Sequence, residues 1–332
     1  MSGPGIGIVG TGSYCPKTEV TNEQIAGKAG VTPEWIERKT RIRARRVAAP
    51  SEATSDLATQ AATAALERAG LSAERLDYII VSTSTPDSPQ PPTSCLVQHA
   101  LGAYQAACLD INVVCSGFVY ALELAHRLLV PKPGSYALVI AGDLYSRILD
   151  YTDRRTAVLL GDGAGAAVVG PVPAPGGIVR TSLLTRGDAH GLVRVAAGGS
   201  RRPASAETLA NGEHFFAMNG RGVRDFVLDH VPPAIAGLLA AAHVRADEVA
   251  HFVPHQPNGN LLDELVDAAN LANARTHRTL ETLGNVGSAS VPVTLDAANR
   301  SGQLSDGDLV LLAGFGGGMA IGLSLLRWSA PA

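Results

Sequence analysis

The chain has 332 residues, of which 46% are hydrophobic and 17% are charged, and its formal net charge is −3. This composition is typical of a compact protein with a large core, and the charge gives no general attraction to nucleic acid or anionic membranes. No apolar run reaches the roughly 20 residues that span a bilayer, and the N-terminus lacks the features of a signal peptide, so we expect a cytoplasmic protein.

Short β-rich runs alternate with helical segments along the whole chain. The pattern predicts strands at 5–10, 78–83, 109–114, 136–141, 165–169, 251–253, 309–313 and 321–326, and helices at 55–69, 117–129, 222–243 and 261–269. Such alternation favours an α/β fold with largely parallel sheets.

Two pairs of segments repeat each other. "AALERAGLSAERLDYIIVSTSTP" has the same order of helix, turn, strand and loop as "GLLAAAHVRADEVAHFVPHQPN", and "YALVIAGDLY" is echoed by "DLVLLAGFGG". Both echoes fall at an offset of about 170 residues, which predicts a duplicated unit. We place the two halves at 1–172 and 173–332, joined by the Pro/Gly-rich residues 170–177, and expect the chemistry where the halves meet.

Cys115 lies at the junction between a predicted strand and a predicted helix. The four cysteines, Cys15, Cys95, Cys108 and Cys115, show no C-x-x-C spacing, which argues against a disulfide framework or a zinc site. The unpaired N–H groups at a helix N-terminus favour an anion, so we expect the pKa of the Cys115 thiol to be lowered and the thiolate to act as a nucleophile. The alternative is a buried, inert thiol.

Three loops could supply partners for this thiol. His255 follows a predicted strand in "PHQPN", Asn285 lies between glycines in "LGNVGSASVP", and residues 313–320, "AGFGGGMA", could turn backbone amides toward a substrate. "GDGAG" and "GTGS" lack the full glycine spacing of a dinucleotide-binding loop, so a nicotinamide cofactor is not expected.

Seven motifs in order resemble those of the ketoacyl-acyl-carrier-protein synthase III family: "GTGSYCP", "WIERKTRI", "CSGFVYAL", "GDGAGAAV", "HQPN", "GNVGSAS" and "GFGGG". The resemblance covers nearly the whole chain. It implies a thiolase-like αβαβα five-layer fold built from two duplicated halves, a homodimer, and no metal or redox cofactor, with a coenzyme A thioester as substrate.

The resemblance also implies roles for individual residues. Cys115 would accept the acyl group, His255 and Asn285 would complete the triad, and the amides of Cys115 and Gly317 would form the oxyanion hole. Trp35 would stack on the adenine of coenzyme A, and Lys39, Thr40, Arg154 and Asn258 would line its pantetheine and phosphate channel. Arg38, Arg41, Arg43, Arg45 and Arg46 are expected to add positive charge there; a solvated face is the alternative.

Three functions follow from this resemblance. The first is decarboxylative condensation of an acyl-Cys enzyme with a malonyl thioester to a 3-oxoacyl product, as in fatty acid or polyketide biosynthesis. The second is acyl transfer without decarboxylation to a hydroxyl, an amine or a carrier protein. The third, a silent partner subunit, is disfavoured because the nucleophile and both partner residues are present.

The surface that would dock an acyl-carrier protein departs from the family pattern. Typical members carry an aromatic residue and a lysine where this chain has Arg224 and Asp225, and an arginine where it has Asn260, and acidic residues follow at Asp263, Glu264 and Asp267. Local patches decide docking because charges are screened over roughly 8 Å. An acyl-carrier protein would therefore meet an atypical surface.

Overall fold

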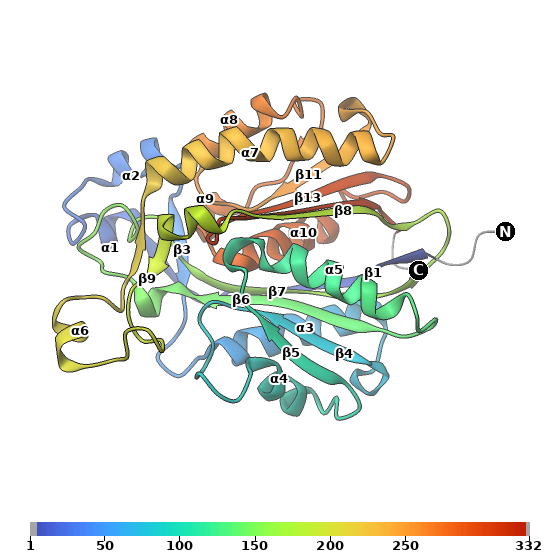
Figure 1. Cartoon of the computed structure of the whole chain (residues 1–332), viewed down its shortest axis with the longest axis horizontal. Coiled ribbons are helices and arrows are strands. Elements are labelled where there is room, and N and C mark those ends of the chain that lie inside the picture. The colour runs from blue at the N-terminus through green and yellow to red at the C-terminus, as the bar shows by residue number, and fades with distance from the viewer. Residues whose placement is uncertain (1–4, 330–332) are drawn as a thin grey trace.

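The computed structural model describes residues 5–329 and shows two five-stranded sheets with helices on both faces of each (Figure 1). The first sheet has the order β1 (Gly5–Tyr14), β7 (Asp162–Val172), β6 (Ala137–Leu144), β4 (Tyr78–Ser82) and β5 (Ala107–Ile111). The second has the order β12 (Arg275–Thr276), β11 (His251–Pro254), β13 (Leu309–Gly316), β14 (Ala320–Arg327) and β8 (Gly177–Thr185). All strands of the first sheet precede residue 173 and all strands of the second follow it, and the division into duplicated halves stays a prediction.

Helices form three layers around these sheets. In Figure 1, α3 (Thr54–Ala69) and α4 (Thr93–Leu101) cover the outer face of the first sheet, and α7 (Gly220–Ala241) and α8 (Gly259–Ala268) cover the outer face of the second. Between the sheets lie α5 (Gly117–Leu129) and α10 (Ser290–Arg300), which pack against strands of both. The predicted five-layer αβαβα fold is confirmed.

The middle layer is apolar because both of its helices are enclosed by sheets. Phe118 and Leu122 of α5 and Leu295 of α10 are fully buried in one cluster that also contains Val139 of β6 and Leu312 of β13. Strands β6 and β13 are buried along their whole length. Strands covered on both faces need continuous apolar runs, which explains "ALVIAGDL" and "LVLLAGFG".

The predicted strands and helices are found, and the boundary that differs near Cys115 is the end of one strand. The strand predicted at 109–114 ends at Ile111, because the side-chain carbonyl of Asn112 accepts a hydrogen bond from the Val114 N–H and turns the chain. The structure also contains α4, α10 and β8, which were not predicted. Pro292 and the β-branched residues around it obscure α10 in the sequence.

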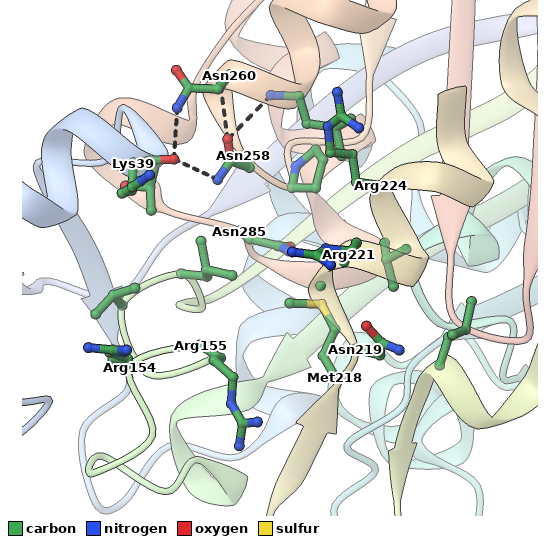
Figure 2. A pocket seen from close by; sticks show the side chains of 18 of the residues that line it. Lys39, Arg154, Arg155, Met218, Asn219, Arg221, Arg224, Asn258, Asn260 and Asn285 are labelled. Atoms are coloured by element: carbon green, nitrogen blue, oxygen red, sulfur yellow. Dashed lines mark hydrogen bonds between the residues drawn. The ribbon is translucent and has the colours of Figure 1, made fainter. Parts of the chain in front are cut away.

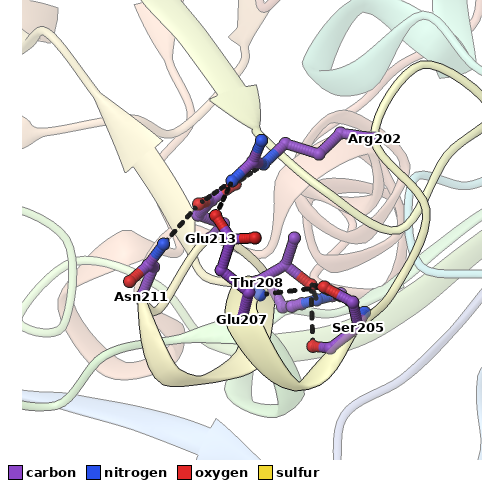
Figure 3. A network of polar contacts seen from close by, with 7 residues as sticks. Arg202, Ser205, Glu207, Thr208, Asn211 and Glu213 are labelled. Carbon is purple, nitrogen blue, oxygen red and sulfur yellow. Dashed lines mark hydrogen bonds and ion pairs between the residues drawn. The ribbon is translucent and has the colours of Figure 1, made fainter.

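Smaller elements surround one end of the layers. They are β2 (Thr18–Thr21), α1 (Asn22–Ala26), α2 (Pro33–Thr40), β3 (Ala44–Val47), β9 (Val193–Val195), α6 (Ala206–Ala210), β10 (Phe216–Met218) and α9 (Leu280–Leu283). The excursion between β9 and β10 is held by ion pairs of Arg202 with Glu207 and Glu213 and by the Ser205–Thr208 cap of α6 (Figure 3). Within residues 5–329, no helix combines the length and apolarity needed to traverse a membrane.

Candidate active site

Cys115 sits in a strained turn directly before α5. The 3-10 helix Val114–Ser116 ends where α5 begins, and Val114 has a φ of 46°. A β-branched residue in the left-handed region costs on the order of 1–3 kcal/mol and persists only where neighbours enforce it. Here the turn packs against β13 and against a second 3-10 helix, Gly287–Ala289. These contacts hold the strained turn in place, and the thiol therefore lies where segments of both sheets meet.

The surroundings of Cys115 do not favour a resting thiolate. Burial, together with the nearby Asp143 carboxylate, raises the pKa of the thiol to about 12, while the backbone N–H groups of Gly317 and Cys115 lower it by less. The predicted lowering is therefore wrong, because desolvation outweighs the helix N-terminus. The two amides nevertheless face the sulfur, and the thiol is protonated near neutral pH.

Gly316 leaves the space that the Cys115 side chain occupies. A Cβ on Gly316 would lie 2.7 Å from the Cβ and 2.9 Å from the Sγ of Cys115. We expect a Gly316→Ala enzyme to form its acyl-enzyme about 100-fold more slowly, because displacing a reacting atom by about 1 Å costs that much. Time-resolved intact-mass analysis measures this rate. The control is Gly237→Ala in α7, where an added Cβ meets open space; equal acylation of the two variants would contradict the assignment.

His255 is a buried, neutral imidazole at the end of β11. It is 2% exposed, its ring meets the Phe315 ring edge-on at 5.5 Å, and its Nδ1 lies 2.6 Å from the Ser290 hydroxyl. Burial lowers the pKa of His255 to about 3, and the backbone carbonyl of Gly287 opposes this more weakly. The ring is therefore uncharged near neutral pH and can act through a neutral nitrogen.

Asn285 is held so that its amide NH₂ group remains available. Its backbone N–H donates to the Leu159 carbonyl at 2.8 Å, and its own carbonyl accepts from the Gly161 N–H at 2.9 Å. Its side-chain Oδ1 accepts from the Gly287 N–H at 2.9 Å. The NH₂ group has no hydrogen-bond partner within residues 5–329. Asn285 therefore offers a donor to whatever occupies the adjoining cavity.

Asp143 connects the two sheets beneath these residues. The carboxylate is fully buried at the end of β6 and accepts from the backbone N–H and hydroxyl of both Ser84 and Ser288, at 2.6–2.9 Å. Burial raises its pKa despite these four bonds. A Cβ on Gly287 would come within 2.5 Å of Asp143 Oδ2, so only glycine fits. This network fixes the Asn285 loop next to the Cys115 turn.

A cavity of about 790 Å³ opens beside Asn285 (Figure 2). Its wall includes the residues predicted to contact coenzyme A, namely Trp35, Lys39, Thr40, Arg154 and Asn258. Cys115, His255 and Gly317 are not part of this wall. The structure thus brings the predicted substrate channel to one member of the predicted triad, Asn285, and the segment that follows Asn285 contacts both the Cys115 turn and His255.

Comparison with known proteins identifies the family to which this chain belongs. The model for 3-oxoacyl-[acyl-carrier-protein (ACP)] synthase III matches residues 109–187, and the model for its C-terminal part matches residues 239–328. The acetoacetyl CoA synthase NphT7 of Streptomyces sp. (strain CL190) is 53% identical over 323 residues, covering 97% of this chain and 98% of the relative. The beta-ketoacyl-[acyl-carrier-protein] synthase III of Symbiobacterium thermophilum is 40% identical over the same shares. The chain belongs to the 3-oxoacyl-ACP synthase III family.

Solved structures agree with this assignment. The 3-oxoacyl-[acyl-carrier-protein] synthase III of Aquifex aeolicus has a TM-score of 0.89 at 34% identity, covering 98% of this chain and 100% of that one. The priming β-ketosynthase of the R1128 polyketide pathway has a TM-score of 0.90 at 34% identity, covering 99% and 98%. The predicted thiolase-superfamily membership is confirmed. The chain is an acyl-transferring condensing enzyme, and the predicted reaction, decarboxylative condensation to a 3-oxoacyl product, is supported by its relatives.

Two side chains of this synthase that were predicted to contact coenzyme A have their polar atoms engaged elsewhere. The Thr40 hydroxyl donates to the Ile36 carbonyl, and the Asn258 amide donates to the Lys39 carbonyl at 3.0 Å while it caps α8 (Figure 2). Both therefore shape the wall of the cavity. Arg154 lies over the Trp35 ring, with its Cζ 5.8 Å from the centroid.

The basic run after Trp35 does not supply charge to the cavity as expected. Arg45 is 1% exposed and donates to the Val158 carbonyl and to Asn22, whereas Arg41, Arg43 and Arg46 bond Asn260, Glu281 and Glu19. Arg38 does not line the cavity either. The prediction is therefore wrong for the cavity wall, which none of these five arginines lines. Arg45 is buried in β3, Arg46 pairs with Glu19 across the β2–β3 hairpin, and Arg41 bonds Asn260, a residue of the wall.

Other arginines take their place on the cavity wall. Arg155, Arg194 and Arg221 line it, and none of them was predicted. Arg221 directly follows the short motif "MNG" at residues 218–220. Its place one residue after that motif is the signal that could have revealed it.

Proposed function

We propose that this synthase condenses acetyl-CoA with malonyl-CoA, rather than with a malonyl carrier protein, to form acetoacetyl-CoA, carbon dioxide and coenzyme A. The choice of malonyl-CoA over a malonyl carrier protein rests on the charge distribution around the cavity mouth. The name of the 53% identical relative, acetoacetyl CoA synthase, supports both the acetyl group and the coenzyme A product.

The face expected to meet a carrier protein has its positive charge neutralised. Arg224 donates to Glu264 at 2.5 Å across α7 and α8, and it also contacts Asp225 at 3.4 Å. Asp263 accepts from Arg278 at 2.7 Å. An acidic carrier protein would thus find paired charges in place of free cations, and docking of this kind depends on such complementarity.

Inside the cavity mouth, positive charge stays available. The side chains of Lys39, Arg194 and Arg221 have no hydrogen-bond or ion-pair partner among residues 5–329, and all three line the cavity. Phosphate groups bind best to such free cationic donors. The free cations at the cavity mouth therefore attract a small polyanionic thioester, whereas the paired charges on the docking face do not attract a carrier protein.

The residues around Cys115 account for the first half of the reaction in our proposal. The thiol attacks the acetyl thioester carbonyl, the S–C bond to coenzyme A breaks, and the thiol proton ends on the departing coenzyme A. The amides of Cys115 and Gly317 hold the oxyanion. Each such donor contributes about 3–4 kcal/mol to the transition state. The acetyl group is then bound to sulfur.

The second half forms the carbon–carbon bond. The bond between the malonyl α-carbon and its carboxylate breaks, carbon dioxide leaves, and the electron pair forms an enolate whose oxygen receives hydrogen bonds from His255 and Asn285. The α-carbon then attacks the acetyl-Cys115 carbonyl and expels the thiolate, which takes up a proton. The broken bond supplies the electrons of the new one, so these steps use no redox cofactor.

A competition between acceptors tests this proposal. With acetyl-CoA as donor, we expect kcat/KM for malonyl-CoA to exceed that for a malonyl carrier protein by at least about 10-fold, which is about 1.4 kcal/mol. Mass spectrometry identifies the 3-oxoacyl product. Glu264→Gln, which removes the closer of the two acidic partners of Arg224, should raise turnover of the carrier protein several-fold. Its matched control is Glu281→Gln, which removes a partner of Arg43 away from the cavity. A preference for the carrier protein would overturn the choice of acceptor.

We also propose that the synthase is a homodimer that joins through β5. This strand forms the edge of the first sheet and pairs with β4 on one side within the described chain. Tyr104, just before it, is 65% exposed. An edge strand presents unpaired N–H and C=O groups that a second copy can satisfy. Sedimentation at about twice the chain mass of 34.2 kDa would support the dimer, and a monomer would exclude it.

A further inference from the structure

Arg45 is a buried arginine that has no ion-pair partner within residues 5–329. It lies in β3 and is 1% exposed. Its guanidinium donates to the Val158 carbonyl at 2.7 Å, to the Asn22 side-chain oxygen at 2.9 Å and to the Val20 carbonyl at 3.3 Å. Burial lowers its pKa only to about 10, so the group stays charged near neutral pH. Burying such a charge is costly, and these hydrogen bonds must offset the cost.

The segment that Arg45 bonds is the one that holds the backbone of Asn285. Val158 is followed by Leu159, whose carbonyl accepts from the Asn285 N–H at 2.8 Å. Two residues further on, the Gly161 N–H donates to the Asn285 carbonyl at 2.9 Å. A shift of residues 158–161 would therefore be passed directly to the backbone of Asn285.

The stem of the Arg45 side chain lies against both partners of this clamp. A Cβ on Gly161 would lie 3.1 Å from the Arg45 Cβ, and a Cβ on Gly284 would lie 3.2 Å from it. Gly284 directly precedes Asn285 and has a φ of 69°, which favours glycine. Arg45 thus packs on the two chain segments that meet at Asn285, and its guanidinium bonds one of them.

We propose that Arg45 is a positioning residue for Asn285: its bond to the Val158 carbonyl and the packing of its stem fix where the Asn285 amide lies. The bond from the Gly287 N–H to Asn285 Oδ1 sets the orientation of that amide, and Arg45 sets its location. This inference rests on the proposed role of Asn285 as a donor to the enolate oxygen. The Cys115 turn packs against β13 and the 3-10 helix 287–289, so acylation should depend on Arg45 far less.

The proposal predicts a defect in one half-reaction of an Arg45→Met enzyme. Methionine keeps an unbranched stem but removes every donor, which leaves the buried Val158 carbonyl and Asn22 oxygen without this partner. We expect kcat for decarboxylation of malonyl-CoA to fall by about 100-fold, because a displacement of about 1 Å costs that much. The rate of acyl-enzyme formation should stay within about threefold of wild type. Arg46→Met is the matched control, because Arg46 is the next residue of β3 and pairs with Glu19; both of its rates should stay within about threefold.

A double-mutant cycle tells positioning of Asn285 from a general structural role. If Arg45 acts through the Asn285 amide, Arg45→Met has nothing left to displace in an Asn285→Ala enzyme. We expect the double variant to decarboxylate malonyl-CoA within about threefold of Asn285→Ala alone. Losses that multiply in the double variant would overturn the proposal, and so would equal losses of acylation and decarboxylation in Arg45→Met.

Arg45→Lys gives a second, milder test and is the variant to use if Arg45→Met does not fold, as thermal unfolding will show. Lysine keeps the charge and offers one nitrogen where the guanidinium uses two, so we expect about a 10-fold loss of decarboxylation with acylation unchanged. This loss should also disappear in the Asn285→Ala background. A wild-type rate of decarboxylation in Arg45→Lys, or a loss that persists in that background, would overturn the proposal. Failure of the proposed function shows up separately, as absence of a 3-oxoacyl product from the wild-type enzyme.

Discussion

A Cys115→Ala enzyme is expected to form no acyl-enzyme and yet to continue releasing carbon dioxide from malonyl-CoA. The substitution removes the sulfur that forms the thioester, so no covalent adduct can accumulate. The proposed enolate donors come from other segments, because His255 follows β11 and Asn285 lies in the loop before α10. Removing the thiol therefore leaves the decarboxylation site in place, and the acetyl group has nowhere to go.

Two measurements on the same sample check this expectation. Intact-mass analysis after incubation with acetyl-CoA should show the acetyl adduct on wild type and none on Cys115→Ala, and trapping of labelled carbon dioxide measures decarboxylation. Cys95→Ala is the matched control, because Cys95 is a partly exposed free thiol in α4. An adduct that persists in Cys115→Ala would place the nucleophile elsewhere in the chain.

The His255→Ala and Asn285→Ala enzymes should show the reverse pattern. Each loses one donor to the enolate oxygen, and such a loss costs about 100- to 1,000-fold in kcat. Acyl-enzyme formation should fall far less, because the amides that face the sulfur belong to Cys115 and Gly317. Burial lowers the pKa of His255 to about 3, so the ring that remains in Asn285→Ala stays neutral and the defect of that variant should not change between pH 6 and 8.

Single-turnover experiments separate the two half-reactions of these variants. Acyl-enzyme formed in advance is mixed with malonyl-CoA, and the decay of the adduct is followed by mass. Thermal unfolding of each variant, measured in parallel, tells a catalytic loss from an unstable fold. If both half-reactions slow equally while the fold stays intact, His255 and Asn285 do not act on the enolate, and the proposed mechanism is incorrect.

Much of the fold follows from local patterns. The apolar runs of β6 and β13 and the helical periodicity of α5 are visible in the sequence, because strands enclosed on both faces and a helix between sheets must be apolar on their covered surfaces. The same reading places Cys115 at the start of α5, and it does so without the family resemblance. The ordered motifs then lead to Cys115, His255 and Asn285.

The pKa values and contacts of the site residues depend on neighbours that are distant from them in the sequence. The Cys115 pKa depends on burial and on Asp143, and the fate of Arg45 depends on Asn22 and the Val158 carbonyl. The ion pair of Arg224 with Glu264, on which the proposed acceptor rests, joins two separate helices. A sequence indicates which residues are charged, and only the folded chain decides which of those charges are paired.

What the sequence by itself determined is the alternation of most strands and helices, the family, and the three residues that we assign to the reaction. The tertiary structure alone decided the protonation of Cys115, the orientation of Asn285 and the contact of Ser290 with His255. The physical reason is that periodicity and turn residues act locally on the backbone. Desolvation and hydrogen bonding depend instead on which atoms lie within a few ångströms after both sheets have packed on the central helices.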